Sequence, residues 1–71
     1  MNSENKRAFV SALETALILY SSTGIAKMDY AVTESGMEFV KIYFSRERSK
    51  VIDVTGDNCI AIMQDIWEAL L

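Results

Sequence analysis

The sequence has no histidine, no proline and only one cysteine, Cys59. A lone cysteine cannot form a disulfide within the chain, and the usual zinc ligand sets need histidines or several cysteines. A nucleophile paired with a histidine base is excluded for the same reason. Cys59 itself falls on the apolar face of a predicted helix, which is typical of a buried structural cysteine. We therefore expect a protein that is not an enzyme and binds neither metal nor cofactor.

The chain also lacks a basic excess and a long apolar run. Seven Lys and Arg stand against ten Asp and Glu, a net charge of −3 that argues against nucleic acids and anionic membranes as partners. No apolar run approaches the roughly 18 residues of a transmembrane helix, and the start, MNSENKRAFV, does not have the pattern of a secretory signal. Together with the lone cysteine, these features predict a cytoplasmic location.

Apolar residues, in contrast, are abundant. They make up 51% of the 71 residues. From its length we interpret the chain as one domain spanning residues 1–71. A domain this small buries only about 60% of its unfolded surface, so some apolar surface must stay exposed or contact another chain. We expect a homo-oligomer, most simply a two-fold dimer, or a complex with another protein. A monomer with scattered exposed apolar residues is the alternative.

Two segments have the apolar spacing of amphipathic helices, residues 3–22 and 57–71, each with an apolar arc roughly 200° wide. Ile18 lies apart from the arc of the first helix, and either this residue or the arc's flank could contact a second subunit. In the second helix the predicted core side is broad, with the cap at Asp57 or Thr55. It comprises Cys59, Ile62, Met63, Ile66 and Leu70, widened by Ile60, Trp67 and Leu71.

Between the helices, three segments alternate as β-strands do: residues 25–33, 38–45 and 50–54. Short turns connect them, one ending in Gly36 and one wholly polar. The sequence therefore predicts an α+β fold of order α-β-β-β-α, a three-stranded antiparallel meander with both helices packed on one face. The expected inward-facing residues are Ala26, Met28, Tyr30, Val32, Glu38, Val40, Ile42, Phe44, Lys50, Ile52 and Val54.

The sheet face away from the helices is the first candidate for function. Phe39, Tyr43 and Val51 lie on it together with Lys41. We interpret this outer face as an interface for an identical subunit or a different protein. Ordinary cross-strand pairing, with Lys41 covering the rings, explains the same residues equally well.

A basic cluster at the second strand turn, Arg46, Arg48 and Lys50, is the second candidate. The element order resembles that of the double-stranded-RNA-binding domain, whose RNA contacts include a lysine-rich start of the last helix. Here that start is Gly56-Asp57-Asn58-Cys59, so the resemblance is limited to topology. Nucleic-acid binding through the basic turn is the alternative function, and protection of a sheet edge by charge accounts for the arginines too.

Three aspartates, Asp53, Asp57 and Asp65, are close in sequence, as in some magnesium or acid–base sites. Their predicted places are the outer sheet face, a helix cap and the solvent side of a helix, so we expect them not to converge.

The C-terminal half, with its strand, turn, strand and the run VTGDNCIAIMQDIWEALL, resembles short uncharacterised accessory proteins of bacterial mobile elements and phages. This resemblance implies a regulatory role through protein contact, such as inhibition of a host system. Our first hypothesis is therefore a non-enzymatic interaction or regulatory module that self-associates through the outer sheet face, with Ile18 as a further contact.

Overall fold

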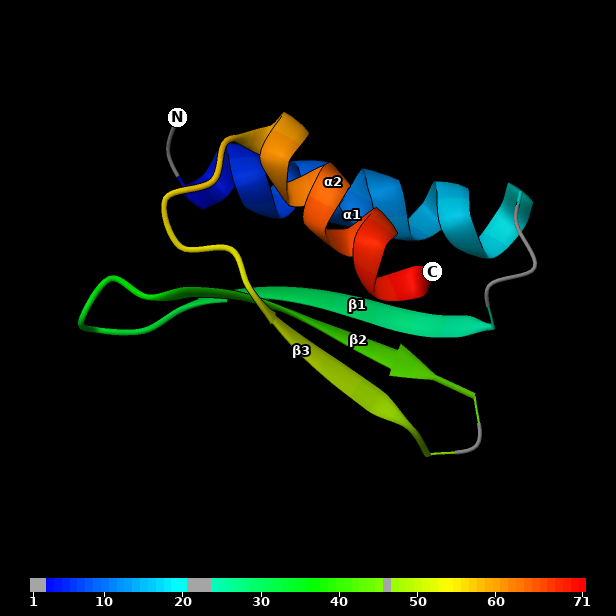
Figure 1. The fold of residues 1–71 in the computed structure, drawn as a ribbon. Coiled ribbons are helices and arrows are strands. Elements are labelled where there is room, and N and C mark those ends of the chain that lie inside the picture. The colour runs from blue at the N-terminus through cyan, green and yellow to red at the C-terminus, as the bar shows by residue number, and fades with distance from the viewer. Residues whose placement is uncertain (1–2, 21–23, 46) are drawn as a thin grey trace.

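The computed structural model describes residues 3–20, 24–45 and 47–71. Two helices, α1 (Ser3–Tyr20) and α2 (Cys59–Leu70), enclose three strands in sequence: β1 (Ile25–Val32), β2 (Glu38–Phe44) and β3 (Ser49–Asp53). The strands form one antiparallel sheet of order β1-β2-β3. Both helices lie over the same face of this sheet (Figure 1). The predicted α+β class and the α-β-β-β-α order are confirmed.

The turns follow the local chemistry of the chain. Gly36 closes the β1–β2 connection with a φ of 88°, and its N–H donates to the Thr33 carbonyl at 3.0 Å. Gly24, just before β1, has a φ of 76°, a left-handed value that glycine adopts without a Cβ clash. The cap of α2 differs from the prediction: the Asn58 side chain, rather than Asp57 or Thr55, accepts from Ala61 N–H at 2.8 Å.

The start of β1 departs from simple alternation. Ile25 is buried and Ala26 is exposed, because the register with β2 shifts between Ile25 and Lys27. Such a bulge turns the side chains that precede it to the opposite face. The prediction that Ala26 points inward was therefore wrong. Val32, at the other end of the strand, is also exposed rather than buried.

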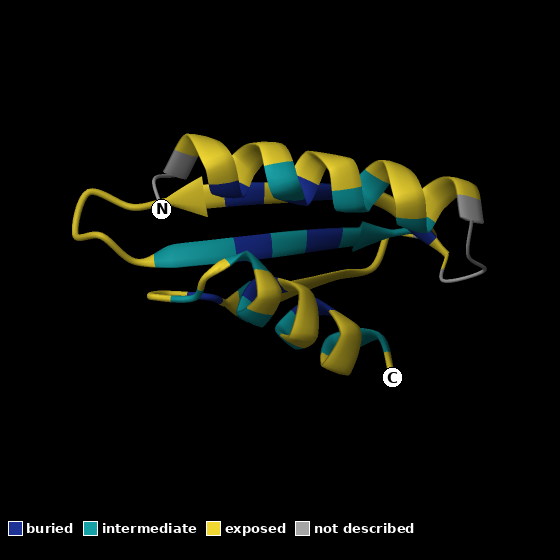
Figure 2. Cartoon of the chain, turned by 90° about the horizontal axis from the view of Figure 1, so that it is seen from above, coloured by how far each residue is buried: buried dark blue, intermediate teal, exposed yellow. Residues whose placement is uncertain are grey.

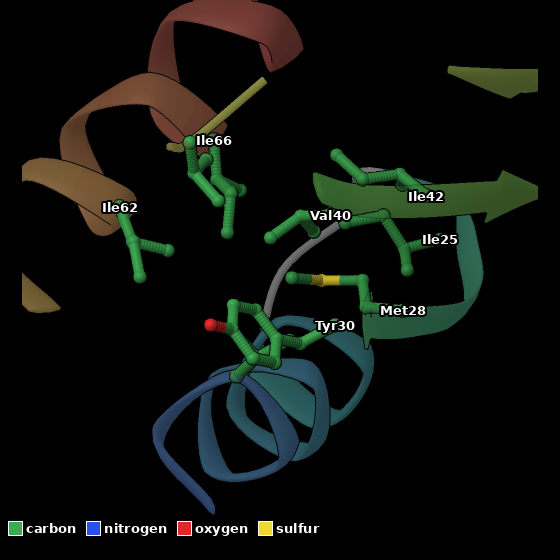
Figure 3. Packing of buried hydrophobic residues seen from close by; sticks show 9 residues of the cluster. Ile25, Met28, Tyr30, Val40, Ile42, Ile62 and Ile66 are labelled. Carbon is green, nitrogen blue, oxygen red and sulfur yellow. The ribbon is translucent and has the colours of Figure 1, made fainter. Parts of the chain in front are cut away.

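The core lies between the sheet and the two helices. The inward rows of β1 and β2 supply most of it, Val10 comes from α1, and Ile62 and Ile66 come from α2 (Figure 3). Seen from the helix side, both helices present exposed residues to solvent (Figure 2). The buried hydrophobic residues are Val10, Ile25, Met28, Tyr30, Val40, Ile42, Val54, Ile62 and Ile66.

Helix α1 also protects an edge of the sheet. Among the described residues, strand β1 has a neighbour only on its β2 side, so backbone groups along its other side could pair with a foreign strand. Arg7 donates to the Tyr30 carbonyl at 2.7 Å, and Glu14 accepts from the Met28 N–H at 2.6 Å. Two side chains of α1 thus occupy backbone groups that strand addition would need.

Neither described helix combines the length and apolarity that crossing a membrane requires.

Candidate interaction surfaces

Helix α2 carries a stripe of large apolar side chains that the core does not use. Ile60 is 64% exposed, Met63 43%, Trp67 57% and Leu71, immediately after the helix, 90%. Their spacing of three to four residues places them along one side of the helix. We call these four residues the α2 stripe. Because they were predicted to widen or join the core side of the helix, that prediction was wrong.

The sheet explains why the stripe stays outside. A helix lying on a sheet buries a band roughly 100° wide, and α2 fills that band with Ile62 and Ile66, both essentially inaccessible. An apolar arc of about 200° therefore leaves close to half of its width uncovered. The stripe is the part of the arc that neither the sheet nor α1 reaches.

A shallow hollow lies in the middle of this exposed surface. Met63, Gln64, Trp67 and Glu68 line it, and it encloses about 490 Å³. Three of these residues offer apolar or aliphatic surface, and Glu68 is the only charged one. The hollow can thus accept an apolar side chain from another molecule, with polar groups at its border.

The outer sheet face brings together the four residues predicted there. Lys41 on β2 pairs with Val51 on β3, and Phe39 and Tyr43 lie two residues to either side of Lys41 on the same face. Phe39, Lys41 and Tyr43 are half-buried, whereas Val51 is 62% exposed. Their proximity follows from the strand register.

Lysines cover the centre of this face. The Lys41 ammonium lies 4.9 Å from the centroid of the Tyr43 ring, and the Lys27 ammonium lies 5.9 Å from it. Lys27 also approaches Asp29 at 3.5 Å. The cations and their aliphatic chains shield much of the Tyr43 ring, so Phe39 and Val51 are what remains for a partner to contact.

Ile18, the fifth predicted interface residue, lies apart from the other four. It is exposed on α1, which packs on the opposite face of the sheet. A partner bound flat on the outer face would therefore not reach it. Ile18 and its exposed neighbour Leu19 form a separate apolar spot near the end of α1.

Two residues of the predicted basic turn make structural contacts. Lys50 Nζ donates to the Ala69 carbonyl at 2.7 Å, at the end of α2, which has no basic residue in its own last turn. A cation at a helix C-terminus is stabilising. The Arg48 guanidinium lies 5.8 Å from the centroid of the Phe44 ring. Arg46 lies outside the described residues, and nucleic-acid binding stays a prediction.

A buried polar cluster, which the sequence did not reveal, joins four segments of the chain. Lys6 of α1, only 7% exposed, donates to Glu38 Oε2 at 2.7 Å, and the Tyr30 hydroxyl donates to the same oxygen. The Gly56 N–H donates to the other oxygen, Glu38 Oε1, at 3.0 Å. The one sign of this cluster in the sequence was a glutamate, Glu38, on a strand face whose other residues are apolar.

The pKa values in this cluster follow from these bonds. The Lys6 hydrogen bond is the main reason why the pKa of Glu38 falls to about 2, and the bonds from Tyr30 and Gly56 lower this pKa further. Burial raises the pKa of Tyr30 to about 12, assisted by its bond to Glu38. At neutral pH the carboxylate is therefore charged and the phenol neutral. The cluster forms an ion pair that links α1 to the sheet.

Asp57 and Asp65 come together, contrary to the prediction. A side-chain hydrogen bond with Asp65 and burial raise the pKa of Asp57 to about 6, and its Oδ2 is buried without a hydrogen-bond partner. Lys6 lowers this pKa and Glu38 raises it, both through their charges. Asp53 does stay apart, as predicted, and accepts from the Thr55 N–H at 2.9 Å. This convergence was not predicted from the sequence, because eight residues separate the two aspartates and Asp57 precedes the helix that contains Asp65.

This pair predicts an unusual dependence of stability on pH. The pKa of Asp57 is higher in the folded state than its ordinary value of 3.8, so the folded state binds the proton more tightly. Stability should therefore fall as the pH rises from about 4 through about 6. Glu38 acts oppositely: its contribution is present above its ordinary pKa of 4.5 and is lost as the pH falls towards 2. We expect these two groups together to give maximal stability near pH 4.

Asp57→Asn tests this. It should remove the fall between pH 4 and pH 6 and raise stability at pH 7.5 by on the order of 1 kcal/mol after solvent screening, or about 4–8 °C in Tm. Thermal melts of both proteins from pH 3 to pH 8, followed by circular dichroism, measure the effect. Parallel pH profiles for the two proteins would contradict it.

Cys59 is half-buried at the first position of α2, partly in line with the predicted buried role. Within the described ranges, no group of three or more His, Cys, Asp or Glu residues is placed to hold a metal ion.

Comparison of the chain with protein-family models, curated proteins and solved structures finds no match. The predicted resemblance to accessory proteins of mobile elements thus stays a prediction. Inferences about function depend on the surfaces described above.

Proposed function

We propose that this chain is a non-catalytic protein-interaction module whose principal binding surface is the α2 stripe. The observation that carries the proposal is the exposure of Ile60, Met63, Trp67 and Leu71 on one side of a helix whose other side completes the core. Contiguous apolar surface of this kind, with a tryptophan at its centre, is characteristic of protein interfaces.

Stability alone does not account for these side chains. Polar residues at the same positions would leave the packing of Ile62 and Ile66 unchanged, because the core cluster contains no member of the stripe. Polar side chains there would also make the protein less prone to aggregate. The stripe is therefore best explained by a partner that covers it.

The outer sheet face is the second candidate surface, and self-association through it was the first hypothesis from the sequence. Val51 is well exposed there, and Phe39 is half-buried. The lysines over Tyr43 make this face more polar than the α2 stripe. We therefore rank the outer sheet face below the α2 stripe as a binding surface.

Site-specific photo-crosslinking in native cell extract tests the proposed function. A photoreactive benzoylphenylalanine replaces Gln64, which is exposed within the stripe, and in a matched control it replaces Thr15, which is exposed on α1. Position 64 should give one dominant adduct of defined mass, and position 15 should not. Adding Trp67→Glu to the position-64 protein should reduce the adduct at least tenfold.

Two results would count against the proposal. One is the same set of adducts from positions 64 and 15, which would indicate random collision. The other is an adduct at position 64 that Trp67→Glu leaves unchanged.

A further inference from the structure

We infer that the partner of the α2 stripe is a second copy of this chain, bound through an antiparallel α2–α2 pair with a two-fold axis. The inference rests on the proposed function and names its partner. It follows from the residues that α2 exposes, from the chemistry that a two-fold axis would bring together, and from the area involved.

The exposed residues of α2 form one continuous face. From position 59 to position 71, the exposed positions recur at intervals of three, one, three, one and three residues, while all the others are buried or half-buried. This interval pattern is that of a helix contacting another helix along its length. The six exposed residues are Ile60, Met63, Gln64, Trp67, Glu68 and Leu71.

A two-fold axis between positions 65 and 66 makes this face complementary to itself. In a two-fold contact, residue i meets residue j and j meets i. Ile60 then meets Leu71 of the other copy, an apolar pair at each end of the contact. In the centre, Trp67 meets Gln64 of the other copy, and its ring enters the hollow that Met63, Gln64, Trp67 and Glu68 line.

Charge favours the antiparallel arrangement over a parallel one. Glu68 is the only charged residue on the face. In a parallel pair it would face Glu68 of the other copy, whereas in the antiparallel register it faces Met63. The two carboxylates are then five residues apart along the axis, about 7.5 Å at 1.5 Å per residue. The opposed direction also places the positive end of each helix near the negative end of the other.

The area suits a reversible dimer. At about 200 Å² for a fully exposed large side chain, the exposed fractions of the stripe amount to on the order of 500 Å² per copy. This is about a tenth of the 4834 Å² surface of the chain, the usual share for an interface of a small protein. The total of roughly 1,000 Å² lies at the lower bound for a specific interface, so dissociation in the micromolar range is expected.

Sedimentation equilibrium of the purified chain from about 1 µM to 1 mM tests the inference. The wild type should show a reversible monomer–dimer equilibrium. Trp67→Glu should raise the dissociation constant at least about 100-fold, and Val51→Glu on the outer sheet face should change it by less than about threefold. Circular dichroism at 222 nm verifies that each variant stays folded.

Two substitutions at Met63 test the register. Met63→Lys places a cation opposite Glu68 of the other copy, and Met63→Glu places a second anion there. The two variants lose the same apolar side chain, so their dissociation constants should differ by about tenfold or more, with the lysine variant the tighter. Raising the salt to 0.5 M should reduce this difference.

The inference is overturned if the purified chain is monomeric at 1 mM, if Trp67→Glu dimerises like the wild type, or if Val51→Glu abolishes the dimer. Equal constants for Met63→Lys and Met63→Glu would overturn the antiparallel register. A monomeric purified chain that still gives an adduct of a different mass in extract would leave the proposed function standing with another partner. Absence of both dimer and adduct would reject both.

Discussion

Replacing Glu38 by glutamine should destabilise the protein by about 2–4 kcal/mol. The substitution keeps the size of the side chain but removes the charge that Lys6 requires, and Lys6 is 7% exposed with its ammonium 2.7 Å from the carboxylate. A buried cation without its counter-ion costs far more than the net value of the pair. A domain of this size has a total stability of about 4–10 kcal/mol, so a large part of it depends on one carboxylate.

Urea unfolding followed by circular dichroism measures this loss, with Glu34→Gln in the exposed β1–β2 turn as the control. The control should stay within about 0.5 kcal/mol of the wild type. The double variant Lys6→Met with Glu38→Gln should be more stable than the sum of the single changes predicts, because it leaves no buried charge. A loss below about 1 kcal/mol for Glu38→Gln would show that water replaces the carboxylate.

Two isoleucines of α2, Ile60 and Ile62, should respond very differently to replacement by alanine. Ile62 is completely buried in the core, so Ile62→Ala should cost about 3–4 kcal/mol through lost burial and a residual cavity. Ile60 is 64% exposed, and Ile60→Ala should cost less than about 0.5 kcal/mol in the monomer. Both variants replace isoleucine by alanine in the same helix, so the difference in their stability reports burial alone.

Urea unfolding of both variants at a protein concentration of about 1 µM measures these costs, because the inferred dimer is largely dissociated at that concentration. At about 1 mM, Ile60→Ala should in addition lower the stability that dimerisation provides. Similar costs for the two variants at low concentration would mean that α2 is rotated about its own axis, away from the orientation in which Ile62 points into the core (Figure 3).

Much of the fold could be predicted because strands have a short, strict period. Val40 and Ile42 face inward and Lys41 faces outward, as expected because successive side chains of a strand point to opposite faces of the sheet. The outer sheet residues of the candidate site could be placed for the same reason. The bulge at the start of β1 could not be predicted, because strict alternation back from Met28 places Ala26 inward, and only the register with β2 makes Ile25 the inward residue.

The two features of greatest functional interest depend on tertiary structure. The sequence by itself determined that α2 has an apolar arc of about 200°, but the position of the sheet decided that Ile62 is buried and Trp67 exposed. The sequence likewise indicated that a charged residue, Glu38, lies on an inward face. Only folding brings Lys6 and Gly56 to that carboxylate, because contacts between residues 18 and 32 positions apart leave no local pattern. Sequence periodicity determines faces, and packing decides which faces remain exposed.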